Sequence, residues 1–224
     1  MNTEIREWGK IKKQILDFTT RSVEDFLKEN SDLEFYSFAF DCNAEYAELG
    51  LSFNTETSFQ KTLKSYQTGE FSQYYKSEED IRELKYNTGD WDYLYFDSLD
   101  VFSNDELDKI FNEFPEDDYK SWNEFVSNLL NLFTECLIEF TKTETYAKIP
   151  KTKDFICFCI DHDEDFDDAM ERIEKYNYST ATDVNSHQQK KQGNVLDFQS
   201  SKSYLALKLM RISGFSFKIK STAG

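Results

Sequence analysis

The sequence has few of the residues that make turns and linkers. Its 224 residues include only 7 glycines and 2 prolines, which argues against collagen-like, linker-rich and many-turned architectures. Long apolar runs are missing too, because the longest spans only Phe155 to Ile160, well short of a membrane span. The first residues, MNTEIREWGKIKKQ, carry charges where a signal peptide needs an apolar segment. We therefore expect a cytoplasmic protein with no membrane partner.

Soft metal ligands and nucleophiles are also scarce. The four cysteines, Cys42, Cys136, Cys157 and Cys159, have no dense, regular spacing, which favours free thiols over a disulfide framework. A closed zinc site needs four ligands, and the sequence has only two histidines. The same shortage argues against a Ser/His/Asp triad, and an acidic surround disfavours a cysteine thiolate. No glycine-rich phosphate loop is present, so we predict no catalytic, cofactor-binding or metal-binding residues.

One acidic run invites a calcium interpretation. Carboxylates alternate from Asp161 to Asp168, as they do at the start of calcium-binding loops. Counted from Asp161, however, the sixth position is Phe166 where the loop needs glycine, and the twelfth is Arg172 where it needs glutamate. Acids are favoured at a helix N-terminus, so the run predicts a strand that leads into a helix.

Bases are in the minority and are unevenly distributed. The chain has 43 acids and 26 bases, and its formal net charge is −17. Residues 1–177 hold 41 of the acids and 19 of the bases, so this body carries −22. Seven bases and two acids follow in residues 178–224. The body should repel nucleic acid and anionic membranes and attract basic partners.

Periodic apolar residues predict the helices. Steps of three and four from Ile5 to Phe26 predict an amphipathic helix over about residues 4–28. A broad apolar stripe predicts a second long helix, in the core, over about residues 119–142. Shorter helices are expected at 57–66, after Ser77, between Ser103 and Pro115, and after the acidic run.

Aromatic and β-branched segments predict the strands. Residues 33–41 and 46–54 should form an antiparallel hairpin, with Tyr36, Phe38 and Phe40 on its core face. Trp91 to Phe96 alternates and predicts a third strand. Phe155 to Ile160 is apolar on both faces, as expected for a strand in the middle of a sheet. The resulting fold class is α+β, with a single mostly antiparallel sheet of about four to five strands flanked by helices.

The chain divides into an acidic domain and a basic C-terminal segment. The domain covers residues 1–177. A polar stretch without periodicity begins at Tyr178 and indicates a linker. Two segments beyond it, SYLALKLMRI and GFSFKIKS, could pair as a hairpin, which would need to dock on the body because two strands alone are marginally stable.

One segment combines carboxylates with aromatic rings that could contact a partner. Between Tyr86 and Tyr119 there are eleven acids and a single base. Carboxylates beside aromatic rings suit lysine and arginine side chains. The predicted partner-binding residues are Asp90, Trp91, Asp92, Tyr93, Tyr95, Asp97 and Asp100. The same pattern also fits a strand with an aromatic core face and a solvated acidic edge.

The hairpin FYSFAFDCNAEYAELGLSFNTE, the later GDWDY and the order of the elements resemble a bacterial domain family of unknown function. Some of its members resemble immunity proteins of polymorphic toxin systems. The resemblance covers residues 1–177. It implies a fold but brings no catalytic signature. Since fold alone does not establish function, the resemblance does not imply an activity.

Three functions remain open at this point. The leading hypothesis is a non-enzymatic, immunity-like protein that sequesters a basic partner such as a toxin. A second is a hydrolase that uses two carboxylates in a cleft. A third is a regulatory module whose basic tail binds polyanions. The sequence leaves the oligomeric state unknown.

Overall fold

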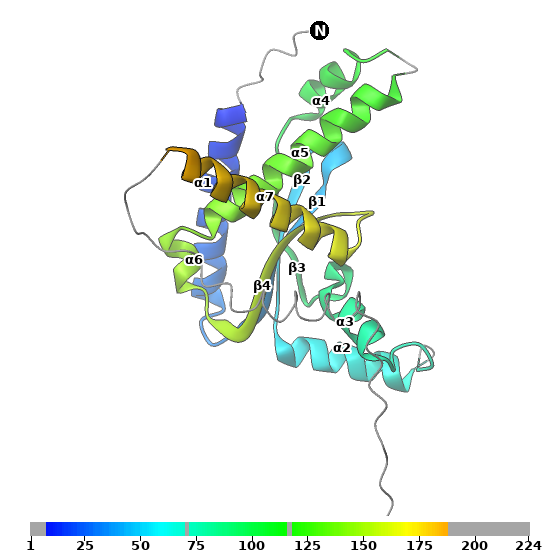
Figure 1. Ribbon diagram of the computed structural model, residues 1–224. Helices are drawn as coiled ribbons and strands as arrows, with labels where there is room; N and C mark the ends of the chain where they lie inside the picture. Colours follow the sequence, from blue (N-terminus) through cyan, green and yellow to red (C-terminus); the bar gives the residue numbers. More distant parts are fainter. Residues whose placement is uncertain (1–7, 70–71, 116–117, 188–224) are drawn as a thin grey trace, which may run out of the picture. The chain divides into compact units, whose positions relative to one another are not determined.

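A single mixed sheet organises the protein. The computed structural model describes residues 8–69, 72–115 and 118–187 (Figure 1). The strands are β1 (Phe35–Asn43), β2 (Glu48–Asn54), β3 (Tyr93–Asp100) and β4 (Lys151–Asp161), in the spatial order β3-β2-β1-β4. The β1/β2 and β2/β3 pairs are antiparallel, and β1/β4 is parallel. The predicted α+β class, hairpin and strand number are confirmed.

Seven α-helices pack with this sheet in the described part of the chain. They are α1 (Trp8–Glu29), α2 (Glu56–Thr68), α3 (Glu78–Tyr86), α4 (Asn104–Phe111), α5 (Tyr119–Phe140), α6 (Glu144–Lys148) and α7 (Phe166–His187). Local capping explains several starts: the Thr55 hydroxyl accepts a hydrogen bond from the Ser58 amide, and Ser77 forms a capping box with Asp80. Both predicted long helices and the helix after the acidic run are confirmed.

Aromatic side chains fill both faces of the sheet. On one face α1 and α5 cover β1 and β2, and Phe38 contacts both Phe53 and Phe140, with ring centroids 4.6 and 5.6 Å apart. On the other face Phe158 of β4 meets Trp91 and Phe166. Because both faces are covered, β1 is buried along nearly its whole length.

Two predicted strand placements are corrected by the pairing. Tyr36 does not share a face with Phe38, because the β1/β4 register shifts between Phe35 and Ser37. The Tyr36 ring contacts Trp91 instead. The second correction concerns β4, which lies at an end of the described sheet and not in its middle. Its apolar character still has a cause, since helices cover both of its faces.

Two predicted boundaries also move. The third strand starts at Tyr93, so Trp91 lies before it, at the end of a 3₁₀ turn over residues 88–90. The predicted linker starts too early, since α7 continues to His187. The hairpin predicted after residue 200 lies outside the described residues.

Candidate functional site

The candidate partner surface begins at β3, an end strand of the sheet. The Val101 amide, just past the strand, donates to the Ala47 carbonyl at 2.9 Å. Amides alternate in direction along an antiparallel strand, so those of Leu99 and Asp97 face β2 while those of Ser98 and Asp100 face away. β3 therefore presents backbone groups on its outer side, which proteins usually protect with charge, bulges or covering side chains.

Trp91 and Asp90, two of the predicted contact residues, have internal roles. Trp91 is only 5% exposed, and its indole N–H donates to the Lys85 carbonyl at 3.0 Å. Asp90 accepts hydrogen bonds from the Tyr66 hydroxyl and from the side-chain Nδ2 of Asn87, each at 2.7 Å. This carboxylate raises the pKa of Tyr66 to about 12. The two residues hold the segment before β3 against α2 and α3.

Tyr93 and Asp97 also point inward. The Tyr93 ring meets Phe26 of α1 edge to face, with centroids 5.5 Å apart. Asp97 accepts a hydrogen bond from the Ser22 hydroxyl of α1 at 2.6 Å and another from the Ser98 amide at 2.9 Å. Its carboxylate therefore joins β3 to α1 and accepts the hydrogen bond of one outward-facing backbone amide, that of Ser98.

Tyr95 sits at an irregularity in β3. The β2/β3 register shifts between Leu51 and Phe53, and Tyr95 has a φ of 46°, which is uncommon for a bulky residue. Its ring lies directly on Gly50, where an added Cβ would be 2.3 Å from Tyr95 Cε1. Although Tyr95 is 37% exposed, one side of its ring packs on Gly50 of β2.

Exposed carboxylates flank β3, at Asp92 before the strand and Asp100 at its end, and continue along α4. Six are exposed, and we call them the acidic surface: Asp92, Asp100, Asp105, Glu106, Asp108 and Glu113. Within the described ranges no lysine or arginine forms an ion pair with Asp92, Asp100, Asp105 or Asp108. Lys109 is the only base between residues 86 and 119. The acidic surface therefore keeps two of the seven predicted contact residues, Asp92 and Asp100.

Sequence reasoning missed two exposed aromatic residues beside these acids. Phe111 ends α4 and is 57% exposed, and Tyr119 begins α5 and is 73% exposed. Both fall inside predicted helices, a short one between Ser103 and Pro115 and the long core helix over about residues 119–142, where an aromatic residue is expected to face the core. The helical period of apolar residues shows which face of a helix is buried. It does not show whether the end of that helix projects into solvent or packs on the rest of the domain.

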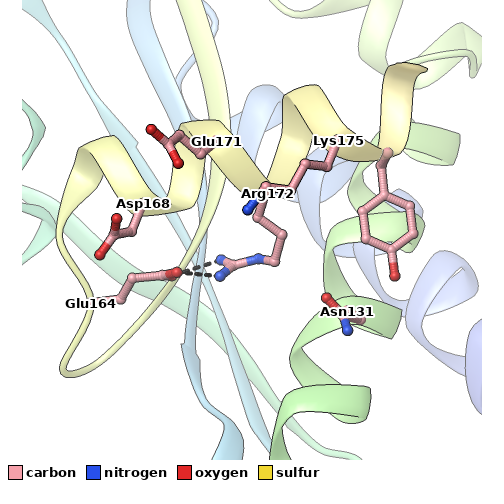
Figure 2. A pocket seen from close by; sticks show the side chains of 7 residues that line it. Asn131, Glu164, Asp168, Glu171, Arg172 and Lys175 are labelled. Carbon is pink, nitrogen blue, oxygen red and sulfur yellow. Dashed lines mark hydrogen bonds and ion pairs between the residues drawn. The ribbon is translucent and has the colours of Figure 1, made fainter. Parts of the chain in front are cut away.

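Away from the acidic surface, an open pocket of about 390 Å³ lies along the first turns of α7. Figure 2 shows the Arg172 side chain pointing at Glu164, with which it forms a bidentate ion pair. Arg172 also donates to the Thr134 hydroxyl at 2.9 Å and to the Cys159 carbonyl at 2.7 Å. Three acids line the pocket, namely Glu164, Asp168 and Glu171. Of these, Glu164 forms the ion pair with Arg172.

The deepest carboxyl group of the sheet belongs to Asp41 of β1. It is 7% exposed, and burial raises its pKa. The Thr88 hydroxyl and the nearby His162 favour its charged form, while Asp161 and Glu48 disfavour it. Asp41 is the register partner of Gly50, so the Tyr95 ring lies over the neighbouring strand position.

The cysteines are buried or half-buried free thiols. The Cys42 and Cys159 sulfur atoms lie 3.6 Å apart on neighbouring strands. Burial raises the pKa of Cys42 well above its usual range and that of Cys136 to about 12. A nucleophilic cysteine needs a lowered thiol pKa and access, and these two thiols have neither.

Within the described ranges no helix is both long and apolar enough to cross a membrane. Comparison with curated proteins and with solved structures gives no match. A family model described as a domain of unknown function, DUF4303, matches residues 15–178. Since these residues make up well over half of the chain, the protein belongs to the DUF4303 family.

Proposed function

We propose that this protein is a non-enzymatic, immunity-like binding protein that sequesters a basic protein, such as a toxin, in the cytoplasm. The observation that carries the proposal is the acidic surface. Its exposed carboxylates flank β3 and continue along α4, and four of them have no described cationic partner. A partner that supplies the missing cations would therefore bind without first breaking internal ion pairs.

Electrostatics gives this surface a kinetic advantage. A chain with a net charge of −17 attracts a basic protein over distances set by the ionic strength. Complementary fields raise association rates more than they lengthen complex lifetimes. Fast capture suits a protein that must neutralise a harmful partner before the partner acts.

A carboxylate hydrolase has less support. Such an enzyme needs two carboxyl groups free to act on a substrate. In the pocket beside α7 both oxygens of Glu164 accept hydrogen bonds from Arg172. That carboxylate is therefore already neutralised by Arg172, whose other hydrogen bonds hold the fold, so a catalytic pair in this pocket would have to come from Asp168 and Glu171.

The test is capture of partners from a lysate of the source cell with the tagged full chain. We would compare the wild type with a variant that carries lysine at Asp92, Asp100, Asp105 and Asp108. A matched variant would carry lysine at four exposed acids outside the acidic surface, Asp32, Glu34, Glu144 and Asp154. Both variants change the net charge equally, so only the position of the charges differs.

We expect the wild type and the matched variant to capture a basic protein that the surface variant loses. Association with the purified partner should slow by about tenfold or more between low and physiological salt. Co-expression should relieve any growth defect that the captured protein causes. Partners without basic character, or equal losses in the two variants, would contradict the proposal.

A further inference from the structure

The corner between α4 and α5 carries an aromatic cluster that is partly open to solvent. The Phe111 ring meets Trp122 edge to face, with centroids 5.1 Å apart. Phe114 contacts Trp122 from another position at 5.8 Å, and Phe125 stacks on Trp122 at 5.4 Å. Trp122 is half-buried, whereas Phe111 is mostly exposed. The inner rings thus hold the outer one in place.

Tyr119 begins α5, the helix that carries Trp122 and Phe125. It lies three residues before Trp122, and residues spaced by three are neighbours on a helix surface. Asp118 caps the helix, accepting a hydrogen bond from the Ser121 amide at 3.1 Å. This hydrogen bond fixes where α5 starts and so fixes the backbone position from which the exposed Tyr119 side chain projects. The corner therefore presents two aromatic rings, Phe111 and Tyr119, on a preformed support.

The segments that carry these rings are rich in acids. Between Asn104 and Glu124 the described residues include six acids, namely Asp105, Glu106, Asp108, Glu113, Asp118 and Glu124, and two bases, Lys109 and Lys120. An exposed ring face in a negative field attracts cations. Arginine suits such a place better than lysine, since its planar guanidinium group is weakly hydrated, stacks on rings and binds carboxylates in a bidentate manner.

We infer that the rings of Phe111 and Tyr119 receive arginine side chains of the basic partner, so that the protein prefers arginine-rich to lysine-rich surfaces. The inference rests on the proposed function and adds a chemical preference to it. Under this arrangement the acidic surface attracts the partner, and the α4–α5 corner slows its release. Binding hot spots commonly combine a central aromatic or arginine contact with a polar rim in this way.

The test uses labelled deca-arginine and deca-lysine peptides, which have equal charge, and measures affinity by fluorescence anisotropy. The wild-type chain should bind deca-arginine about three- to fivefold more tightly than deca-lysine. A variant with leucine at both Phe111 and Tyr119 keeps apolar volume at the corner but removes the ring faces. The matched control is Tyr74→Leu, which changes a tyrosine that is 59% exposed elsewhere.

The arginine preference should fall in the double-leucine variant to the part that the carboxylates supply, and should persist in full in the Tyr74 control. Binding of both peptides should keep its salt dependence in every case. Equal affinity of the wild type for the two peptides, or a preference that the double substitution leaves undiminished, would overturn the inference. If both peptides still bind with a steep salt dependence, the proposed function stands without it.

Two further outcomes are informative. Binding of neither peptide would remove both the inference and the electrostatic basis of the proposed function. The alternative occupant of the corner is a second copy of the chain, which sedimentation velocity would reveal. A wild-type dimer that becomes monomeric when Phe111 and Tyr119 are replaced would overturn the inference, because the corner would then be a self-association surface.

Discussion

At the scale of single residues, the contact between Gly50 and Tyr95 couples two strands. A Cβ at position 50 would lie 2.3 Å from Tyr95 Cε1, so Gly50→Ala must displace the ring or separate β2 from β3. We expect this substitution to lower the free energy of unfolding by about 1–3 kcal/mol. In a Tyr95→Ala background the same substitution should cost under about 1 kcal/mol, since no ring remains to be displaced.

Urea unfolding of the four proteins in this cycle measures the coupling between Gly50 and Tyr95. A coupling free energy near zero would show that the ring does not restrict position 50. Tyr95→Gly provides a separate comparison, because glycine adopts a φ of 46° without the strain that tyrosine bears there. Its stability relative to Tyr95→Ala isolates the backbone contribution.

Asp41 gives the fold a pH dependence of a particular sign. Because burial raises the pKa of Asp41 above its ordinary value of 3.8, the folded state binds this proton more tightly than the unfolded state does. The stability that protonation contributes is complete below pH 3.8 and is lost as the pH rises through the folded-state pKa.

Asp41→Asn should therefore raise the melting temperature at pH 7 by a few degrees, since asparagine carries no charge to bury. The advantage should shrink as the pH falls toward 3.8. Thermal unfolding at several pH values measures both effects. An advantage that grows as the pH is lowered would mean that Thr88 and His162 stabilise the carboxylate more than burial opposes it.

At the scale of elements, Arg172 connects α7 to β4 and α5. Its guanidinium group is largely buried and contacts Glu164, Thr134 and the Cys159 carbonyl. Arg172→Ala leaves Glu164 without its cation and should lower the free energy of unfolding by about 3 kcal/mol. Lys175→Ala removes an exposed cation from the same stretch of α7. It should change the free energy of unfolding by under about 0.5 kcal/mol. Equal losses in the two variants would mean that the Arg172 contacts add no stability of their own.

Most elements could be predicted because their signals are local. The 3.6-residue period of α1 and α5, the capping box at Ser77 and the alternation of the β1/β2 hairpin all depend on neighbouring residues. The place of β4 could not be predicted in the same way. Its apolar residues indicate burial on both faces, and helices can supply that cover at the end of a sheet as well as in the middle.

The candidate site shows the same limit more sharply. The acid-rich segment was identifiable from composition, but the direction of each side chain depends on a register shift in β3 and on contacts with distant elements. Asp97 meets Ser22, which is far away in sequence, and Trp91 is buried against Phe158. The exposed rings of Phe111 and Tyr119 went unrecognised because a helical period does not reveal which helix ends project into solvent.

At the scale of the whole molecule, the two parts of the chain carry charges of opposite sign. Residues 188–224 contain seven bases and one acid, so these residues reduce the negative charge of the protein by six. The field that a distant basic partner meets is the sum over all charges, and it sets the association rate at low salt. The C-terminal bases should therefore slow capture whatever the conformation of their segment.

Replacing all seven of these bases with glutamine changes the formal net charge from −17 to −24. We expect this variant to associate with a basic partner several-fold faster than the wild type at about 10 mM salt. The difference should largely vanish at about 1 M salt, where the Debye length falls to about 3 Å. Stopped-flow kinetics at both ionic strengths measures it. Slower association of the variant at low salt would mean that the basic segment contacts the partner directly, which charge summation alone does not allow.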